Sequence, residues 1–172
     1  QSQTKIGNLY PILAKQIWTY NPLTKTGGTA DIVYATSVVY VSCDPQEGSF
    51  ANLIDNDATT FYHSKYSNVG PTESSPFTFV FSAGAKLPIK GMYFNGRSTS
   101  RSGDAKDIDI YSSNDNLTYT LIGSTQLPST AARTEYIFPS GNITAKYFKV
   151  IVKNGWTANQ FVVFGEMNLI KP

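Results

Sequence analysis

Short runs in which apolar and polar residues alternate recur along most of this chain. In one run Phe77, Phe79 and Phe81 occupy every second position, and Phe148 and Val150 continue the same pattern in a later run. Successive side chains of a β-strand point to opposite faces, so a period of two over short runs is typical of strands. The pattern predicts strands at Ser37–Val41, Pro76–Phe81, Leu87–Phe94, Asp107–Tyr111, Leu117–Ile122, Thr134–Phe138, Lys146–Lys153 and Phe161–Ile170.

Turn residues separate these runs. Ser113–Asn116 lies between two predicted strands and predicts a hairpin turn, because Asn and Asp tolerate left-handed backbone geometry. We expect loops at Ser82–Gly84, Arg97–Gly103 and Pro139–Gly141, and one helical turn at Phe50–Ile54. About eight main strands with little helix predict an all-β fold, an antiparallel β-sandwich or jelly roll.

Residues 1–35 differ from the rest of the chain. Leu9–Tyr20 is largely apolar, and Asn21–Thr29 is rich in turn residues. This segment is either an extension linking to a neighbouring domain or an extra strand packed on the edge of the sandwich. The edge position is favoured because apolar side chains such as Trp18 are costly to leave in water. The main domain is expected over residues 36–172.

Composition narrows the class of protein. The 172 residues suit one domain, and the 15% of charged and 13% of aromatic residues suit an extracellular β module. A net charge of +2 does not indicate the dense basic surface that nucleic-acid binding needs. Only one Cys and one His occur, which excludes an internal disulfide and a Cys- or His-rich zinc site. The chain begins with Gln1, so we expect a removed export signal and an extracellular, cell-surface or periplasmic location.

Oxygen-bearing side chains are dense in the segment Ala51–Ser64, and two interpretations of them remain open. The first is a calcium site, since calcium takes six to eight oxygen ligands in irregular geometry. The second is an Asx-rich turn next to the predicted helical turn. The spacing of an EF-hand loop is not met. The side chains concerned are Asn52, Asp55, Asn56, Asp57, Thr59 and Thr60.

The same segment resembles a known family. Ala51–Tyr66 is similar to the signature N-L-I-D-G-D-x-x-T-x-W-H-S of the discoidin domain, also called the coagulation factor type C domain. Bacterial members with this pattern are the family-32 carbohydrate-binding modules, which have the galactose-binding-domain-like fold. Further pieces of the family pattern follow in the same order, at Phe77–Phe81, Ile89–Arg97, Asp107–Asp115, Ala145–Val150 and Phe164–Leu169.

The resemblance implies an eight-stranded jelly roll with a structural calcium ion. Asn56 stands where the family usually has Gly, a mild departure because Asn also adopts a positive φ. Glu166 would bring a carboxylate from the last strand to the ion. The ligands that the resemblance implies are the carbonyl of Asn52, the side chain of Asp55, the position of Asp57, the carbonyl and hydroxyl of Thr60, and Glu166.

The resemblance also implies a shallow sugar site on loops at one end of the domain. Such a site needs an aromatic face for the sugar ring and polar groups that bond its hydroxyls. An arginine supplies a planar fork for two neighbouring oxygens. Trp156, or as a second choice Phe161, would stack on the sugar. The residues that the family pattern places in this site are His63, Tyr66, Arg97 or in its stead Arg101, and Trp156.

Each of these residues also has a structural interpretation. His63 can satisfy a backbone carbonyl, Arg97 can pair with Asp104 or Asp107, and Trp156 can pack against the end of the barrel. The tyrosine of the site can be a rim residue. A binding site can be lost while its fold is kept, because function depends on the loops that the fold carries.

We therefore expect a non-catalytic module that binds a galactose-like or other glycan, as a monomer or as part of a larger multidomain protein. The alternative is a discoidin-type adhesion module that binds protein or membrane. The early loop Ser42–Phe50 is polar and offers only Phe50 as an apolar spike, which argues against membrane docking. An enzyme is not expected, because no nucleophile or phosphate-binding motif occurs and the carboxylates near Asp55 would hold metal.

Overall fold

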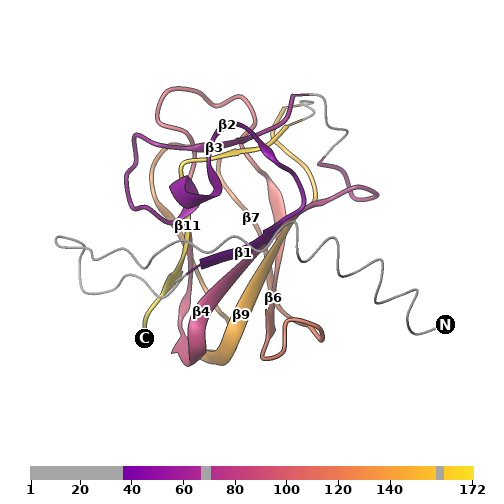
Figure 1. Ribbon diagram of the computed structural model, residues 1–172, viewed down its shortest axis with the longest axis vertical. Helices are drawn as coiled ribbons and strands as arrows, with labels where there is room; N and C mark the ends of the chain where they lie inside the picture. Colours follow the sequence, from indigo (N-terminus) through magenta and orange to yellow (C-terminus); the bar gives the residue numbers. More distant parts are fainter. Residues whose placement is uncertain (1–36, 67–70, 158–160) are drawn as a thin grey trace.

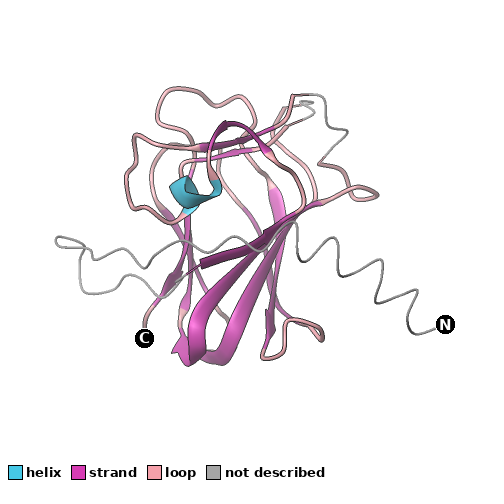
Figure 2. Cartoon of the chain, viewed as in Figure 1, coloured by secondary structure: helices cyan, strands magenta, loops and turns pink. Residues whose placement is uncertain are grey.

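The computed structural model describes residues 37–66, 71–157 and 161–172. Within these ranges the chain forms a β-sandwich with one short 3-10 helix (Figures 1 and 2). The strands are β1 (Ser37–Val41), β2 (Pro45–Gly48), β3 (Tyr62–Ser64), β4 (Phe77–Ile89), β5 (Gly91–Asn95), β6 (Asp107–Ser113), β7 (Thr120–Gln126), β8 (Thr134–Ile137), β9 (Ile143–Val152), β10 (Val163–Phe164) and β11 (Glu166–Ile170), and the helix is η1 (Phe50–Leu53).

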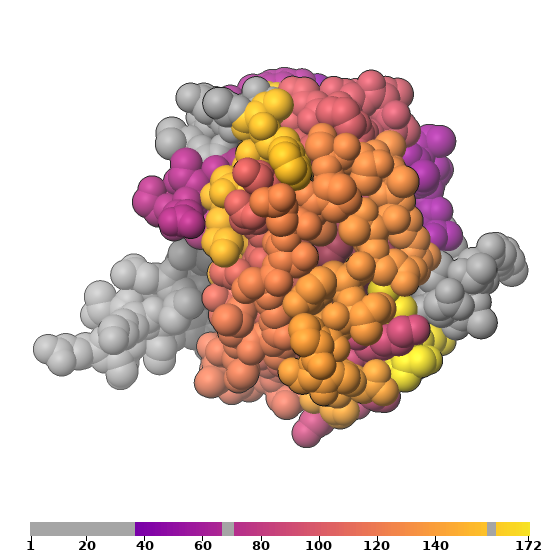
Figure 3. All heavy atoms as spheres, turned by 180° about the vertical axis from the view of Figure 1, so that it is seen from behind, coloured from indigo at the N-terminus to yellow at the C-terminus, as the bar shows by residue number. Residues whose placement is uncertain are grey.

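Two antiparallel sheets enclose the core. One has the strand order β1-β4-β9-β6-β7, and the other has the order β11-β5-β8. A third small sheet, β10-β3-β2, lies at one end of the sandwich, at the top of Figure 1. Seen from behind, strands from the second half of the chain make up most of the surface (Figure 3). The fold class expected from the sequence is confirmed.

The alternating runs bury the side chains that the sequence predicted. Phe79 and Phe81 of β4 are fully buried, and so are Phe148 and Val150 of β9, with which they pair in register. Met92 of β5 belongs to the same apolar cluster, so the core joins both sheets. Burying a large apolar side chain stabilises a fold by roughly 1.5–3 kcal/mol. These runs therefore determine which faces of the sheets meet.

Several predicted boundaries are wrong. The predicted strand Leu117–Ile122 lies instead at Thr120–Gln126, because the Asp115 carboxylate accepts the amides of Leu117 and Thr118 and extends the turn, and the predicted strand Phe161–Ile170 divides at Gly165.

Ser82–Gly84 is not a loop: β4 continues through it, with a register shift between Ser82 and Leu87 and with Gly84 at φ 80°. A bulge keeps the strand paired while it accommodates these small residues. The predicted strand Leu87–Phe94 divides at Lys90, whose carbonyl accepts a hydrogen bond from the Phe138 amide, because the chain passes there from one sheet to the other.

Other parts of the chain also agree with or differ from the sequence analysis. β2 and β3 were not predicted, because Pro45–Gly48 is polar and Tyr62–Ser64 is very short. The helical turn is confirmed as η1. The hairpin turn at Ser113–Asn116 is confirmed, with Asn116 at φ 61°. The predicted N-terminal extension, residues 1–35, lies outside the described residues. No helix in the described part of the chain is long and apolar enough to cross a membrane.

Candidate functional site

The loops between the sheets gather at the end covered by the small sheet. The described parts of this loop end are β2, β3 and the segments 96–106, 127–133, 153–157 and 161–162. Isolated bridges join Asp104 to Val163 and Ala105 to Gly155, so the segment at residues 104–105 pairs with two stretches from the end of the chain. Figure 3 shows the segments around residues 100 and 155 next to each other at the top of the molecule.

An aromatic cluster occupies one side of the loop end. The ring centroid of His63 lies 4.6 Å from that of Tyr66 and 4.5 Å from that of Phe161, and the Tyr66 and Phe161 centroids are 5.6 Å apart. Tyr66 is 48% exposed, although large aromatic side chains usually gain stability by burial. Its hydroxyl donates a hydrogen bond to the Glu47 carboxylate, and this bond is the main cause that raises the pKa of Tyr66.

His63 lies beneath these rings and is only 3% exposed. Its Nδ1 is 2.6 Å from the carbonyl oxygen of Ser64. A carbonyl can only accept, so Nδ1 carries a proton, and in the matching neutral tautomer Nε2 is the acceptor. The structural interpretation of His63, that it satisfies a backbone carbonyl, is therefore correct. That bond fixes the ring under Tyr66 and leaves the acceptor nitrogen as its remaining polar atom.

Arg97 lies close to the aromatic cluster, on the loop that follows β5. The central carbon of its guanidinium is 3.9 Å from the centroid of the Phe61 ring, which is a cation–π contact. Its positive charge lowers the pKa of Tyr66, against the larger effect of Glu47. Within the described residues, Arg97 forms no ion pair and no hydrogen bond. Its guanidinium stacks on the Phe61 ring, and its N–H donors have no acceptor in that part of the chain.

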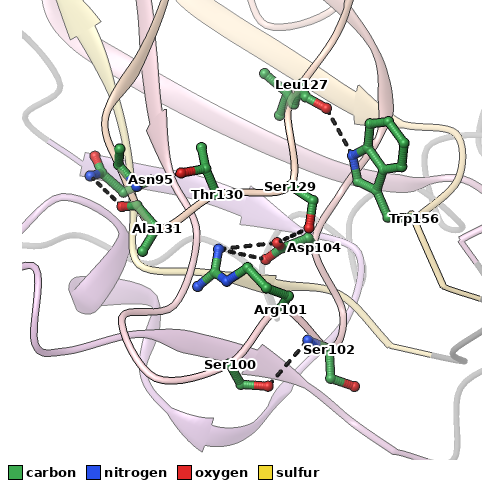
Figure 4. Close-up of polar contacts among 11 residues, drawn as sticks. Asn95, Ser100, Arg101, Ser102, Asp104, Leu127, Ser129, Thr130, Ala131 and Trp156 are labelled. Atoms are coloured by element: carbon green, nitrogen blue, oxygen red, sulfur yellow. Dashed lines mark hydrogen bonds and ion pairs between the residues drawn. The ribbon is translucent and has the colours of Figure 1, made fainter.

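Arg101 is held differently from Arg97. Its Nη1 lies 3.0 Å from Oδ2 of Asp104, which also accepts a hydrogen bond of 2.7 Å from the Ser129 hydroxyl (Figure 4). Asp104 is 3% exposed, and burial raises the pKa of its carboxyl while both partners oppose this shift. The sequence allowed a salt bridge between Arg97 and Asp104. In the structure, Asp104 forms its salt bridge with Arg101 instead.

Trp156 lies beside Asp104 and not in the aromatic cluster. Its backbone amide donates to the Asp104 carbonyl at 3.0 Å, and its indole Nε1 donates to the Leu127 carbonyl at 2.9 Å (Figure 4). Lys106 Nζ is 5.0 Å from the indole centroid. Among the described residues, the aromatic contacts of His63 and Tyr66 involve Phe161, the second choice of the sequence analysis, rather than Trp156.

The structure thus brings together His63, Tyr66 and Arg97 of the predicted sugar site and places Arg101 and Trp156 in a neighbouring cluster. It adds Glu47 from β2, which the sequence analysis did not consider. β2 pairs with β3, and Glu47 lies opposite His63 in that register. A polar strand of four residues gave no periodic signal, so Glu47 could have been found only through this pairing.

The Asp55 loop is closed by its own hydrogen bonds. Oδ1 of Asp55 accepts from the Asp57 amide at 2.9 Å, and Oδ2 accepts from the Thr60 hydroxyl at 2.8 Å. Asp57 in turn accepts from the amide of Thr59 at 2.9 Å. Asn56 has φ 55°, so it adopts the left-handed geometry that the sequence predicted there. The Asx-rich turn is present, and it does not exclude a cation site.

The oxygen chemistry of this loop suits calcium. Asp55 and Thr60 provide a carboxylate and a hydroxyl in hydrogen-bond contact, which are ligands that calcium takes. β11, which begins with the buried Glu166, packs against η1, and η1 leads directly into the loop. No group of three His, Cys, Asp or Glu side chains gathers as a metal site in the described ranges. Calcium would therefore draw several ligands from carbonyl and hydroxyl oxygens.

Comparison with known proteins identifies the family. The model of the F5/8 type C domain matches residues 35–166. The chain belongs to the F5/8 type C domain family. The resemblance to the discoidin pattern is thereby confirmed. Among curated proteins, none matches this chain.

Solved structures share the fold of this F5/8 type C domain. A CBM32 module from Clostridium perfringens, in complex with GalNAc-β-1,3-galactose, has a TM-score of 0.66 at 19% identity, covering 76% of this chain and 92% of that chain. The family 32 module of C. perfringens NanJ, in complex with galactose, has a TM-score of 0.65 at 16% identity, covering 76% and 90%. A fragment of a putative chitobiase from Bacteroides thetaiotaomicron has a TM-score of 0.68 at 19% identity, covering 87% and 96%.

Proposed function

We propose that this F5/8 type C domain is a non-catalytic carbohydrate-binding module and that its sugar site is the aromatic cluster of the loop end. The observation that carries the proposal is the exposed Tyr66, held by Glu47 and backed by His63 and Phe161, next to the guanidinium of Arg97, which bonds to no other described residue. Sugar recognition needs an apolar ring surface and a few fixed polar groups, and this cluster offers both.

Each side chain has a role that follows from its chemistry. Tyr66 and Phe161 present ring surface to the apolar C–H face of a sugar. Arg97 offers paired N–H donors to two neighbouring sugar oxygens, and its stacking on Phe61 restricts the side chain before the ligand arrives. The Glu47 carboxylate accepts from a sugar hydroxyl as well as from Tyr66. A galactose-like sugar is the proposed ligand class, because two relatives of this fold were solved with galactose or a galactose-containing disaccharide.

The buried carboxylates of the described chain favour binding over catalysis. Glycoside hydrolysis needs two carboxyl groups that face one substrate cleft. Asp104 is instead engaged by Arg101 and Ser129, and Glu166 is buried beside the Tyr93 hydroxyl at 3.4 Å. In the related structures, modules of this kind come from larger chains such as a family 31 glycoside hydrolase. We extend the same arrangement, and an extracellular location, to this domain.

The adhesion alternative has less support. A discoidin-type membrane contact would use apolar side chains that project from the early loop. Phe50, the candidate spike, stacks on Tyr62 with centroids 5.8 Å apart and packs against the core. It therefore contributes to folding and not to an exposed apolar surface.

A structural calcium ion is the second part of the proposal. Asp55 and Thr60 would supply side-chain oxygens, Asn52 and Asp57 would supply further oxygens of the same loop, and Glu166 would supply a carboxylate from β11. When bound, the ion would link the first part of the domain to its last strand. Its role would be to hold the fold and not to contact the sugar.

A glycan array followed by calorimetric titration tests the sugar site. The wild-type domain in calcium buffer is expected to bind galactose-containing glycans, and Tyr66→Ala and Arg97→Ala are each expected to weaken binding by roughly tenfold or more. The matched control is Leu121→Ala, which removes an exposed apolar side chain of β7 away from the loop end. An empty array with the folded wild-type domain would refute the proposal, and binding to liposomes instead would favour the adhesion alternative.

A further inference from the structure

Among the described residues of the loop end, Asp104 carries the only buried carboxylate. Its side chain is 3% exposed, and burial raises the pKa of the carboxyl above its ordinary value of 3.8, so the ionised form costs free energy in the folded state. The proposed sugar site does not use this group. A charge that is kept buried at a cost in stability is typical of a functional site.

The Asp104 carboxylate closes the loop that carries Arg97, here called the Arg97 loop (Arg97–Gly103). Arg101 Nη1 lies 3.0 Å from Oδ2 and 3.3 Å from Oδ1 of Asp104, and the Asp104 amide donates to the Arg101 carbonyl at 3.3 Å (Figure 4). A Cβ on Gly96 would collide with Arg101 Nη1 and would lie 2.9 Å from Asp104 Oδ1. The ion pair therefore lies against the backbone directly before Arg97 and ties the end of the loop to its beginning.

The same carboxylate joins the Arg97 loop to the segment 127–133. The Ser129 hydroxyl donates to Oδ2 of Asp104 at 2.7 Å, and the carbonyl of Thr130 accepts a hydrogen bond of 3.1 Å from the Gly96 amide. Residues 129 and 130 therefore hold the chain at both ends of the loop. Of these two bonds, only the one from Ser129 ends on a charged group, and bonds to an ionised acceptor are about twice as strong as neutral ones.

Arg97 depends on this loop for its position. Within the described residues its guanidinium stacks on the Phe61 ring and has no hydrogen-bond acceptor. One cation–π contact is a weak restraint on a side chain with many rotamers. The direction of its paired donors is therefore set by the backbone at residue 96, against which the Asp104 ion pair lies.

Two groups favour the ionised form of Asp104. Arg101 supplies the positive charge that acts on the carboxyl, and Ser129 supplies a neutral donor from the segment 127–133, whereas Trp156 bonds only to the Asp104 carbonyl. The other cations of the segments 96–106, 127–133 and 153–157 contact different groups; they are Arg97, Lys106, Arg133 and Lys153. A proton on the carboxyl therefore removes the charged tie of the loop.

We propose that Asp104 is the positioning residue of the sugar site: its ionised carboxylate holds the loop that presents Arg97 to the sugar, and protonation in mild acid releases the loop and with it the sugar. This inference rests on the proposed function of the aromatic cluster and adds a regulation by pH to it. Affinity is complete where Asp104 is ionised and falls as the pH falls through the raised pKa, so the loss begins above the ordinary value of 3.8.

Calorimetric titration between pH 7 and about pH 4 tests the inference, with galactose and GalNAc-β-1,3-galactose as probes. Asp104→Asn keeps the shape of the side chain without its charge. At pH 7 this variant should bind about fivefold more weakly than the wild-type domain, the cost of ordering one long side chain. Its affinity should then stay constant over the acid range in which the wild-type domain loses affinity.

Asp109→Asn is the matched control. The Asp109 carboxylate, on β6, also pairs with one cation and one serine hydroxyl, at 3.1 Å from Lys153 Nζ and 2.6 Å from Ser124 Oγ. Because it does not contact the Arg97 loop, its variant should keep the wild-type affinity and the wild-type pH profile. Acid weakening that persists in Asp104→Asn would assign the pH dependence to another titratable group, such as His63 or Glu47 of the aromatic cluster, and would overturn the inference.

The Arg97 Nε–H resonance gives a readout that needs no sugar. The ring current of Phe61 should displace this resonance in the wild-type domain at pH 7, and the displacement should be lost in mild acid and in Asp104→Asn but kept in Asp109→Asn. If Asp104→Asn lowers only the melting temperature and leaves the resonance and the affinity unchanged, Asp104 stabilises the fold without positioning Arg97. A folded wild-type domain that binds none of the probes or array glycans refutes the proposed function itself, and the resonance still decides whether Asp104 positions Arg97.

Discussion

The aromatic residues of the sandwich core and those of the loop end differ in how they are held. Phe79 and Phe148 are fully buried and are kept in place by packing on all sides. Tyr66 and Trp156 are exposed, and a side-chain hydrogen bond holds each of them, to Glu47 and to Leu127 respectively, together with contacts of the ring. Under the proposed function, stability and ligand contact are assigned to different aromatic groups. The two properties are therefore expected to respond separately to mutation.

The largest effect on stability is expected from the core. Phe79→Ala removes a ring that packs edge-on against Tyr62 at 5.6 Å and Phe164 at 5.5 Å, and leaves a cavity between the sheets. We expect the free energy of unfolding to fall by about 3–5 kcal/mol. Denaturant unfolding measures the change, with Leu121→Ala as the exposed control that should shift it by less than about 0.5 kcal/mol. If Phe79→Ala lowered the free energy of unfolding no more than Tyr66→Ala does, the core and loop-end aromatic groups would not differ in their contribution to stability.

A smaller effect on stability is expected from calcium removal. An ion that binds only the folded state adds about 2.7 kcal/mol at a concentration of about 100 times its Kd. Chelator should then lower the melting temperature of the wild-type domain by roughly 5–10 °C. Asp55→Ala should melt at the same temperature with and without chelator, because its loop lacks the central carboxylate. Equal melting of the wild-type domain in calcium and in chelator would refute the calcium site.

The sequence predicted the sandwich core better than the loop end, for a physical reason. Burial in a sheet leaves a period of two, and this period placed Phe77–Phe81 and Lys146–Lys153 correctly. The period of two gives no signal in a strand that does not bury one whole face. Pro45–Gly48 is a polar strand without alternation, and the small residues Ser82–Gly84 look like a turn although they form a bulge.

The loop end depends on contacts between segments that are distant in sequence. The family pattern identified His63, Tyr66 and Arg97, and the structure places them together. It could not decide between Trp156 and Phe161, because that choice depends on how the segments pair. Phe161 leads into β10, which pairs with β3, the strand that carries His63, whereas Gly155, next to Trp156, pairs with Ala105.

The smallest expected effect is the response to acid of Asp107, which begins β6 directly after the loop end. Hydrogen bonds from Asn154 at 2.8 Å and from Gln126 at 3.1 Å lower the pKa of Asp107 below its ordinary value of 3.8. A carboxyl with a lowered pKa in the folded state stabilises the fold above its ordinary pKa, and this contribution is lost as the pH falls through the lowered value.

Asn154→Ala removes the strongest of these donors, so it tests the polar network of the loop end apart from the apolar core. The variant should melt below the wild-type domain at pH 7, and the difference should shrink as the pH falls below about 3.8 and Asp107 takes up a proton. Asn114→Ala, in the exposed turn between β6 and β7, is the matched control and should show no such dependence. A difference between Asn154→Ala and wild type that stays constant from pH 7 to the acid limit would mean that Asn154 acts through its Oδ1, which accepts a hydrogen bond of 3.0 Å from the Asp107 amide, and not through the Asp107 charge.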